Sequence, residues 1–263
     1  MITLAAWGLL AALAVALPVW ALSLPLRDAS LADRVWSLLV AAPVAVYAAS
    51  LLPPWQLRDG LLLALLLAWA LRLAIYISWR NRGHGEDRRY RAMRERHGAS
   101  FGLKSLYLVF GLQAVLAWVL GWPLLAALGQ PAGLTWLDGL GVLLASGGLL
   151  IETVADAQLA RFLRAPRTPG AVMDRGLWAW SRHPNYFGEA CFWWGLWRMA
   201  LPAAGWAGAW TVVSPLMMTW LLLRVSGVAL LEQDMAERRP AYRDYNARTS
   251  AFVPWPPRRA ARP

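Results

Sequence analysis

The chain is divided into apolar stretches of about twenty residues that alternate with short polar connectors. Seven such stretches can be drawn, at residues 3–23, 33–52, 60–80, 104–121, 137–156, 186–203 and 207–231. A helix of about twenty apolar residues crosses a hydrocarbon core about 30 Å thick, so each stretch predicts a transmembrane helix. The hydrophobic content of 59% also exceeds the roughly 45–50% that is usual for soluble domains. We therefore predict an all-α integral membrane protein with about seven transmembrane helices in one bundle.

Basic residues are concentrated in every second connector. They are Arg80, Arg82, Arg88, Arg89, Arg91, Arg94, Arg96 and Lys104 before the fourth stretch, Arg161, Arg164, Arg167, Arg175 and Arg182 before the sixth, and Arg238, Arg239, Arg243, Arg248, Arg258, Arg259 and Arg262 after the seventh. The connectors on the other side, 53–59, 122–136 and 202–206, contain only Arg58. Since basic connectors stay in the cytoplasm, this alternation predicts an outside N-terminus and a cytoplasmic C-terminus. Topology thus accounts for the net charge of +11 without a nucleic-acid partner.

Polar side chains inside the apolar stretches are candidates for function, because a charge at the centre of a membrane helix costs about 3 kcal/mol on insertion scales. In the stretch 60–80, Arg72 and Tyr76 are four residues apart and so share one helix face. Arg80 and Arg82 are nearer the helix end, where snorkelling explains them equally well. Arg72 lies two turns deeper and is the stronger candidate.

The stretch 137–156 ends in two carboxylates, Glu152 and Asp156, which share one helix face and precede Arg161 and Arg164. One interpretation is a set of ion pairs with these arginines. The other is a polar cup whose carboxylates hydrogen-bond the hydroxyl and amide groups of a ligand while the arginines hold its phosphates.

The densest group of polar residues lies in the segment 176–189, which reads GLWAWSRHPNYFGE. Pro184 suits the first turn of a helix, and it biases the preceding residue toward an extended conformation. Arg182, His183 and Asn185 are then presented at a helix N-terminus, where free N–H groups and the helix dipole favour an anion such as phosphate. Glu189 lies on the same face, one turn further along.

A third polar group follows the last stretch. It contains Glu232, Tyr242, Tyr245 and Arg248 and leads into the segment 252–255, which reads FVPW. A solvated tail is one interpretation. The aromatic and proline residues favour another, in which the tail folds back against the membrane face of the protein.

With these motifs, the sequence resembles bacterial membrane proteins grouped with the steroid 5-alpha-reductase C-terminal domain and, more distantly, the sterol C14 and C7 reductases. The resemblance covers roughly the last 190 residues, from the Asn-Arg-Gly at 81–83, through the carboxylates of 137–156 and the segment 176–189, to the Val-Pro-Trp at 253–255. It suggests two parts, an N-terminal pair of transmembrane helices at 1–58 and a five-helix reductase-like core at 59–263.

The resemblance implies a bundle that holds NADPH in a cavity open to the cytoplasm and reduces an activated carbon–carbon double bond of a steroid-like or other lipid enone in the bacterial inner membrane. The cofactor contacts that it implies are Glu152, Asp156, Arg161, Arg164, Arg182, His183, Asn185, Tyr186, Glu189, Glu232, Tyr242, Tyr245 and Arg248. No Gly-x-Gly-x-x-Gly stands between a strand and a helix, so the membrane bundle itself would bind the cofactor.

The chain departs from the steroid 5-alpha-reductases at the substrate end. Those enzymes use a Gln-Glu pair in the second helix and a tyrosine in the third to polarise the substrate ketone, whereas residues 36–52 contain no carboxylate here. Tyr76 is the tyrosine with the most comparable setting. We expect Tyr76 or Arg72 to assist the substrate oxygen, where negative charge develops during hydride transfer.

Two other classes of function stay open. A membrane methyltransferase of the isoprenylcysteine or phospholipid type shares an Arg-His-Pro-x-Tyr turn, but its cofactor S-adenosylmethionine carries no phosphate, so the arginines favour NADPH. A noncatalytic membrane protein or transporter could also use intramembrane charges. The single cysteine, Cys191, excludes an internal disulfide, and no metal site is expected. The sequence does not indicate an oligomeric state.

Overall fold

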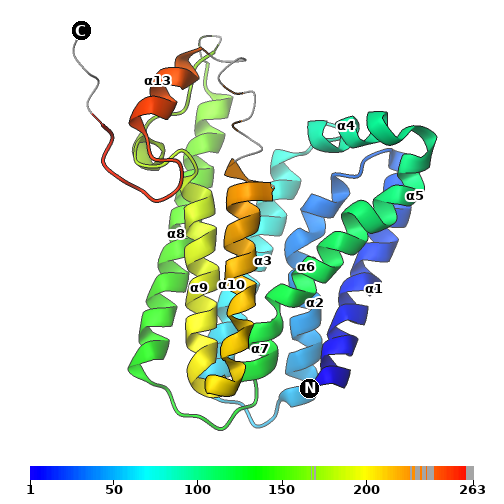
Figure 1. Ribbon diagram of the computed structural model, residues 1–263, viewed down its shortest axis with the longest axis vertical. Coiled ribbons are helices and arrows are strands. Elements are labelled where there is room, and N and C mark those ends of the chain that lie inside the picture. The colour runs from blue at the N-terminus through cyan, green and yellow to red at the C-terminus, as the bar shows by residue number, and fades with distance from the viewer. Residues whose placement is uncertain are drawn as a thin grey trace. The chain divides into compact units, whose positions relative to one another are not determined.

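The computed structural model is helical, and no strand is found in the part of the chain that it describes (Figure 1). That part comprises residues 1–166, 168, 170–225, 227–228, 232, 235 and 240–258. Six helical runs in it are long and apolar enough to cross a membrane: 2–26, 31–51, 57–80, 88–127, 136–164 and 206–225. The predicted class, an all-α integral membrane protein, is thereby confirmed. Of the basic residues used for the topology, Arg167, Arg238, Arg239, Arg259 and Arg262 lie outside the described residues.

The predicted stretch 186–203 forms helix α9, Pro184–Ala204, but this helix is not one of the six candidate spans. Its 21 residues are enough to cross the hydrocarbon core. Polar residues such as Asn185, Glu189 and Arg198, together with several tryptophans, make it less apolar than the other six. A seventh crossing and the locations of the two termini therefore stay predictions.

Two compact units can be distinguished by their internal contacts. The first comprises Met1–Asp138 with Met199–Ser214, and the second comprises Gly139–Arg198 with Pro215–Pro263. Each is described by itself below. The predicted division into residues 1–58 and 59–263 is of another kind, because it marks the extent of the reductase-like core that the resemblance suggests. It stays a prediction.

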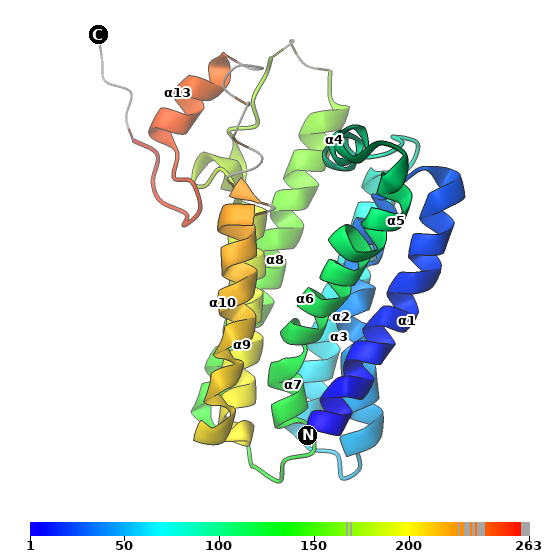
Figure 2. The ribbon, with the colours of Figure 1, turned by 45° about the vertical axis from the view of Figure 1, so that its right-hand side comes forward.

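The first unit is built on three long helices, with a broken helix beside α1 and α2 (Figure 2). Its elements are α1 (Ile2–Leu26), α2 (Leu31–Leu51), α3 (Leu57–Arg80), α4 (Arg88–His97), η1 (Gly98–Ser100), α5 (Phe101–Ser105), the π-helical turn η2 (Leu106–Gly111), α6 (Leu112–Leu120), α7 (Trp122–Ala127) and η4 (Trp206–Val212). The predicted helix at 104–121 thus begins three residues earlier, and it is interrupted by η2. The start of the expected connector 122–136 forms the short helix α7.

Two tryptophans fix α1 in the first unit. Trp20 Nε1 donates to Gly102 O over 3.0 Å, and Trp118 Nε1 donates to Ala5 O over 2.7 Å. A buried indole N–H needs such a partner, and these two bonds anchor α1 at both of its ends. At Gly8, α1 approaches α2 so closely that an added Cβ would overlap the hydroxyl end of the fully buried Tyr47.

We predict that Gly8→Ala lowers the free energy of unfolding by about 1–2 kcal/mol, because the fully buried Tyr47 side chain would have to shift. Gly60→Ala is the matched control, since nothing lies within 4 Å of a Cβ built at Gly60 in α3. The thermal midpoint in detergent should fall for the first variant, and it should stay level or rise slightly for the second. Equal midpoints for the two variants would contradict this prediction.

Arg58 is the only basic residue in the connectors predicted to lie on the non-cytoplasmic side of the membrane. It forms a buried ion pair. Its Nε lies 2.6 Å from Asp138 Oδ1, and its other nitrogens donate to the carbonyl oxygens of Ala132 and Gly133 over 2.8 and 2.7 Å. Thr135 donates to Asp138 Oδ2 from both its backbone nitrogen and its hydroxyl. Both charges are therefore paired and hydrogen-bonded, as burial requires.

The second unit has α8, α9 and α10 side by side (Figure 1; Figure 2). Its elements are α8 (Trp136–Arg164, from Gly139 onward), η3 (Gly176–Ala179), α9 up to Arg198, α10 (Val213–Trp220, from Pro215 onward), η5 (Leu221–Val225) and α13 (Ala241–Arg248). A hydrogen bond of 3.2 Å from Trp194 Nε1 to Thr219 Oγ1 links α9 to α10. The unit therefore contains every cofactor contact that the resemblance implied.

Glycines let α8 and α9 touch backbone to backbone. A Cβ built at Gly148 would lie 2.6 Å from Phe192 N, and one at Gly188 would lie 2.7 Å from Glu152 N. One at Gly195 would lie 2.7 Å from Gly141 O. The three contacts follow each other along the helix pair and fix its register. As a result, the carboxylates near the end of α8 lie beside the first turns of α9.

Candidate functional site

The segment before α9 is folded onto α8. Gly176 has a φ of +60°, which favours glycine, and a Cβ there would meet the side-chain amide of Gln158 at 2.6 Å. The same amide accepts from Leu177 N over 3.0 Å, and Trp178 Nε1 donates to Ala155 O over 3.0 Å. The start of the GLWAWSRHPNYFGE segment is thus anchored on α8, and Pro184 then begins α9 as the sequence indicated.

Glu232 is the centre of a hydrogen-bonded network. Arg182 binds it with both Nε and Nη2, at 2.7 and 2.9 Å. His183 Nε2 lies 2.9 Å from Glu232 Oε1, and the Tyr242 hydroxyl donates to the same oxygen over 3.1 Å. The structure therefore brings together four of the residues singled out in the sequence.

The electrostatics of this network follow from its one carboxylate. Burial opposes ionisation of Glu232, but the hydrogen bonds from His183 and Arg182 outweigh it and lower its pKa to about 2. Burial and the Glu232 charge raise the pKa of Tyr242, so its hydroxyl stays a donor. A fixed anion thus holds the guanidinium and the imidazole in place.

The tail folds back on the Arg182 turn, and it is not a solvated tail. Arg182 N donates to Ser250 O over 2.8 Å, Ser181 Oγ to Phe252 O over 2.8 Å, and Trp255 N to Trp180 O over 2.9 Å. Arg182 Nη1 adds bonds to the carbonyl oxygens of Asn246 and Thr249. The Tyr245 hydroxyl donates to Trp178 O over 2.6 Å. Sequence reasoning missed Ser181 and these carbonyls, because a backbone acceptor leaves no mark in the residue types.

Three carboxylates are buried where α8 meets α9. Glu152, Asp156 and Glu189 are 2%, 6% and 8% exposed. Asn185 Nδ2 donates to Asp156 Oδ1 over 3.2 Å, which joins the two helices. Asn185 Oδ1 is shielded from solvent and accepts no hydrogen bond from the described residues. A buried acceptor of this kind is costly unless a ligand or water satisfies it.

The other predicted residues have varied surroundings. Tyr186 stacks on His183 at 5.5 Å between ring centroids. Arg248 forms an ion pair with Asp174, whereas Arg161 and Arg164 are exposed on the last turn of α8. Arg161 does not join the network around Glu232 within the described residues.

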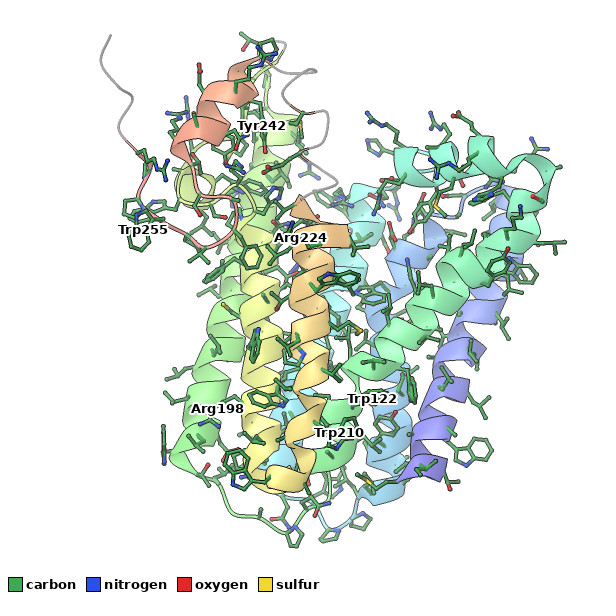
Figure 3. The ribbon with its side chains drawn as sticks, viewed as in Figure 1. Trp122, Arg198, Trp210, Arg224, Tyr242 and Trp255 are labelled. Atoms are coloured by element: carbon green, nitrogen blue, oxygen red, sulfur yellow. The ribbon has the colours of Figure 1, made fainter. Side chains whose placement is uncertain are left out.

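The two predicted catalytic residues belong to the first unit. Arg72 and Tyr76 are partly buried on α3, and Nε and Nη2 of Arg72 are shielded from solvent. The guanidinium of Arg80 lies over the Tyr76 ring at 5.8 Å. Trp122 and Trp210, also of the first unit, pack against each other with ring centroids 5.2 Å apart (Figure 3).

A cavity of about 370 Å³ lies beside the Arg182 turn in the second unit. It is lined by Arg182, Asn246, Ala247, Arg248, Thr249, Ser250, Ala251, Trp255, Pro256 and Arg258. Figure 3 labels Trp255 on the tail and Tyr242 on α13. Across the described ranges, no three His, Cys, Asp or Glu side chains are grouped so that they could hold a metal ion.

A comparison with protein families finds a match to a family described as "Protein of unknown function (DUF1295)", over residues 19–249. The match covers most of the chain, including α8, α9 and the Glu232 network. No curated protein and no solved structure matches the chain.

Proposed function

This chain belongs to the DUF1295 family of proteins of unknown function, and from the chemistry of its site we propose that it is a membrane-embedded, NADPH-dependent reductase of an activated carbon–carbon double bond. The substrate class is a steroid-like or other lipid enone. The family is associated with steroid 5-alpha-reductase-like membrane proteins, which agrees with this proposal. The proposed location is the bacterial inner membrane, with the cofactor site toward the cytoplasm.

The observation that carries the proposal is the buried junction of α8 and α9 next to the Arg182 turn. It offers Asn185 Oδ1 as an acceptor without a described partner, and the carboxylates of Asp156 and Glu189 close to the helix start. These groups suit the ribose hydroxyls and the carboxamide of a nicotinamide nucleotide, which are hydrogen-bond donors. When bound, the cofactor would supply the hydride, and the protein supplies binding and orientation.

Arg182 and His183 would fix the polar groups of the cofactor. Glu232 holds both side chains in place before any ligand arrives, so little side-chain entropy is lost on binding. The arginines beside the turn also favour NADPH over S-adenosylmethionine, because only the dinucleotide carries phosphates for guanidinium groups to bind.

At the substrate end, Tyr76 or Arg72 would donate to the enone oxygen. Hydride addition to the β-carbon moves an electron pair onto this oxygen, and a donor or cation there lowers the barrier. The enolate then takes a proton at the α-carbon, which completes the reduction. The assignment of these two residues depends on the resemblance, and it is tested by enone turnover in Tyr76→Phe and Arg72→Gln.

Titration of the detergent-solubilised protein with NADPH and with S-adenosylmethionine tests the proposal through tryptophan fluorescence, since the chain has 18 tryptophans. We expect saturable quenching by NADPH. Asn185→Ala should weaken this binding about fivefold or more, because one to two hydrogen bonds worth about 1–1.5 kcal/mol each are lost. Thr153→Val, which changes an exposed hydroxyl on α8, should leave the affinity unchanged.

Two results would contradict the reductase. Binding of S-adenosylmethionine without NADPH would indicate a methyltransferase. No response to either cofactor would favour a noncatalytic membrane protein or a transporter.

A further inference from the structure

The cavity beside the Arg182 turn, here called the tail cavity, is built mostly from the C-terminal segment 246–258. Its volume of about 370 Å³ falls in the roughly 300–1,000 Å³ range of small-molecule sites. Backbone hydrogen bonds hold its walls, from Arg182 N to Ser250 O and from Arg258 N to Arg248 O over 2.8 and 2.9 Å. The tail cavity is therefore a fixed feature of the second unit.

The lining of the tail cavity is basic. It contains three arginines, Arg182, Arg248 and Arg258, and no carboxylate. Arg182 forms an ion pair with Glu232, and Arg248 forms one with Asp174. Neither carboxylate lines the cavity. No carboxylate in the described ranges forms an ion pair with Arg258. An anion in the cavity would thus meet the Arg258 guanidinium, which no described carboxylate neutralises, beside the lining residues Thr249 and Ser250.

One wall of the tail cavity is aromatic. The Trp255 side chain lines it and is 69% exposed, although its backbone nitrogen is fixed by Trp180 O at 2.9 Å. An exposed indole on a fixed backbone is a stacking platform for a nucleobase, and such stacking is worth about 1–3 kcal/mol. Inorganic phosphate has no ring that could stack on the Trp255 indole. Arginines and an indole around one cavity therefore point to a nucleoside phosphate.

We propose that the tail cavity binds the phosphorylated adenosine end of the cofactor, with Arg258 on the 2′-phosphate and Trp255 against the adenine, so that it selects NADPH over NADH. This inference rests on the proposed reductase function. It adds two residues, Trp255 and Arg258, to the candidate site, and it assigns the discrimination between the two dinucleotides to the C-terminal segment.

The test is a competition series in detergent, with fluorescence as the readout. The competitors are 2′,5′-ADP, 5′-AMP and inorganic phosphate. Arg258→Gln should weaken 2′,5′-ADP and NADPH about tenfold or more, as expected for a lost charge-assisted hydrogen bond, and should leave NADH and 5′-AMP unchanged. Trp255→Leu should weaken all the adenine compounds and leave inorganic phosphate unchanged. Arg243→Gln is the matched control, because Arg243 is exposed on α13 and does not line the cavity.

Four results would overturn the inference. In the first, NADPH binds and supports turnover, but Arg258→Gln and Trp255→Leu behave like the control variant. The reductase proposal would then stand, and the tail cavity would not be part of the cofactor site. In the second, NADPH binds but none of the three competitors displaces it, which would also exclude the tail cavity from the cofactor site. In the third, the protein binds 2′,5′-ADP in phosphatidylcholine nanodiscs and does not bind it in phosphatidylglycerol nanodiscs. The cavity would then be a site for anionic lipid headgroups. If NADPH itself does not bind the wild-type protein, the proposed function fails, and the inference fails with it.

Discussion

Glu232→Gln is expected to lower the free energy of unfolding by about 3 kcal/mol and to reduce NADPH affinity at least tenfold. The glutamine keeps the shape of the side chain but removes the charge that two basic groups share. Arg182, whose side chain is 9% exposed, would then be a buried cation with a neutral partner. Removing one member of a buried ion pair costs about 3–5 kcal/mol, and the lower end applies here because the Glu232 side chain is 18% exposed.

The same carboxylate predicts a pH dependence that identifies its role. Its pKa is lowered from 4.5 to about 2, so its contribution to stability is complete above about pH 5, and it is lost as the pH falls from about 4.5 toward 2. The wild-type thermal midpoint should therefore fall steeply between about pH 4.5 and pH 2. Glu232→Gln lacks this group, so its midpoint should fall less, and the two proteins should converge at low pH. Parallel curves would show that Glu232 is not the ionised centre of the network.

The second large effect is expected at the contact between α8 and α9. Gly148→Ala should destabilise the protein by about 3 kcal/mol or more, because its Cβ would lie 2.6 Å from Phe192 N and overlap Gly188 O. Both are backbone atoms of a helix and cannot rotate away as a side chain can, so the helices must separate. Separation would also move Asp156 away from Asn185, and NADPH binding should be lost together with stability.

Gly147→Ala is the matched control for this prediction. Gly147 precedes Gly148 in α8, and nothing lies within 4 Å of a Cβ built there. Alanine should be neutral or slightly stabilising at this position, since it is the better helix former. Thermal unfolding in detergent and NADPH titration of the two variants make the comparison. If they behave alike, α8 and α9 do not touch at the glycines.

The helices could be predicted from the sequence because they follow from length and apolarity alone. The start of α9 was also predictable, since Pro184 restricts both itself and the residue before it. The interruption of the fourth apolar stretch by η2 was not predicted. The separate helix α7 was missed although Gly121 and Pro123 mark its start in the sequence. Gly148 and Gly188 read like any glycines in an apolar stretch, and only the partner helix gives them a role.

The candidate site was predictable in its residue types and not in its pairing. Arg182, His183, Glu232 and Tyr242 were singled out as polar residues beside apolar stretches, yet Arg182 and Glu232 are 50 positions apart. Nothing local indicates that they pair. The interpretation that Arg161 and Arg164 pair with the carboxylates of α8 used sequence proximity, and both arginines are exposed on the last turn of that helix.

The buried pair Arg58 and Asp138 joins positions that are 80 residues apart in the chain. Neither charge can leave water alone without a large loss of hydration energy. Closure of the first unit is therefore a concerted step, in which the beginning of α3 and the beginning of α8 give up their water together. During synthesis, this step has to wait until the ribosome has passed residue 138, because Arg58 has no access to its carboxylate partner before then.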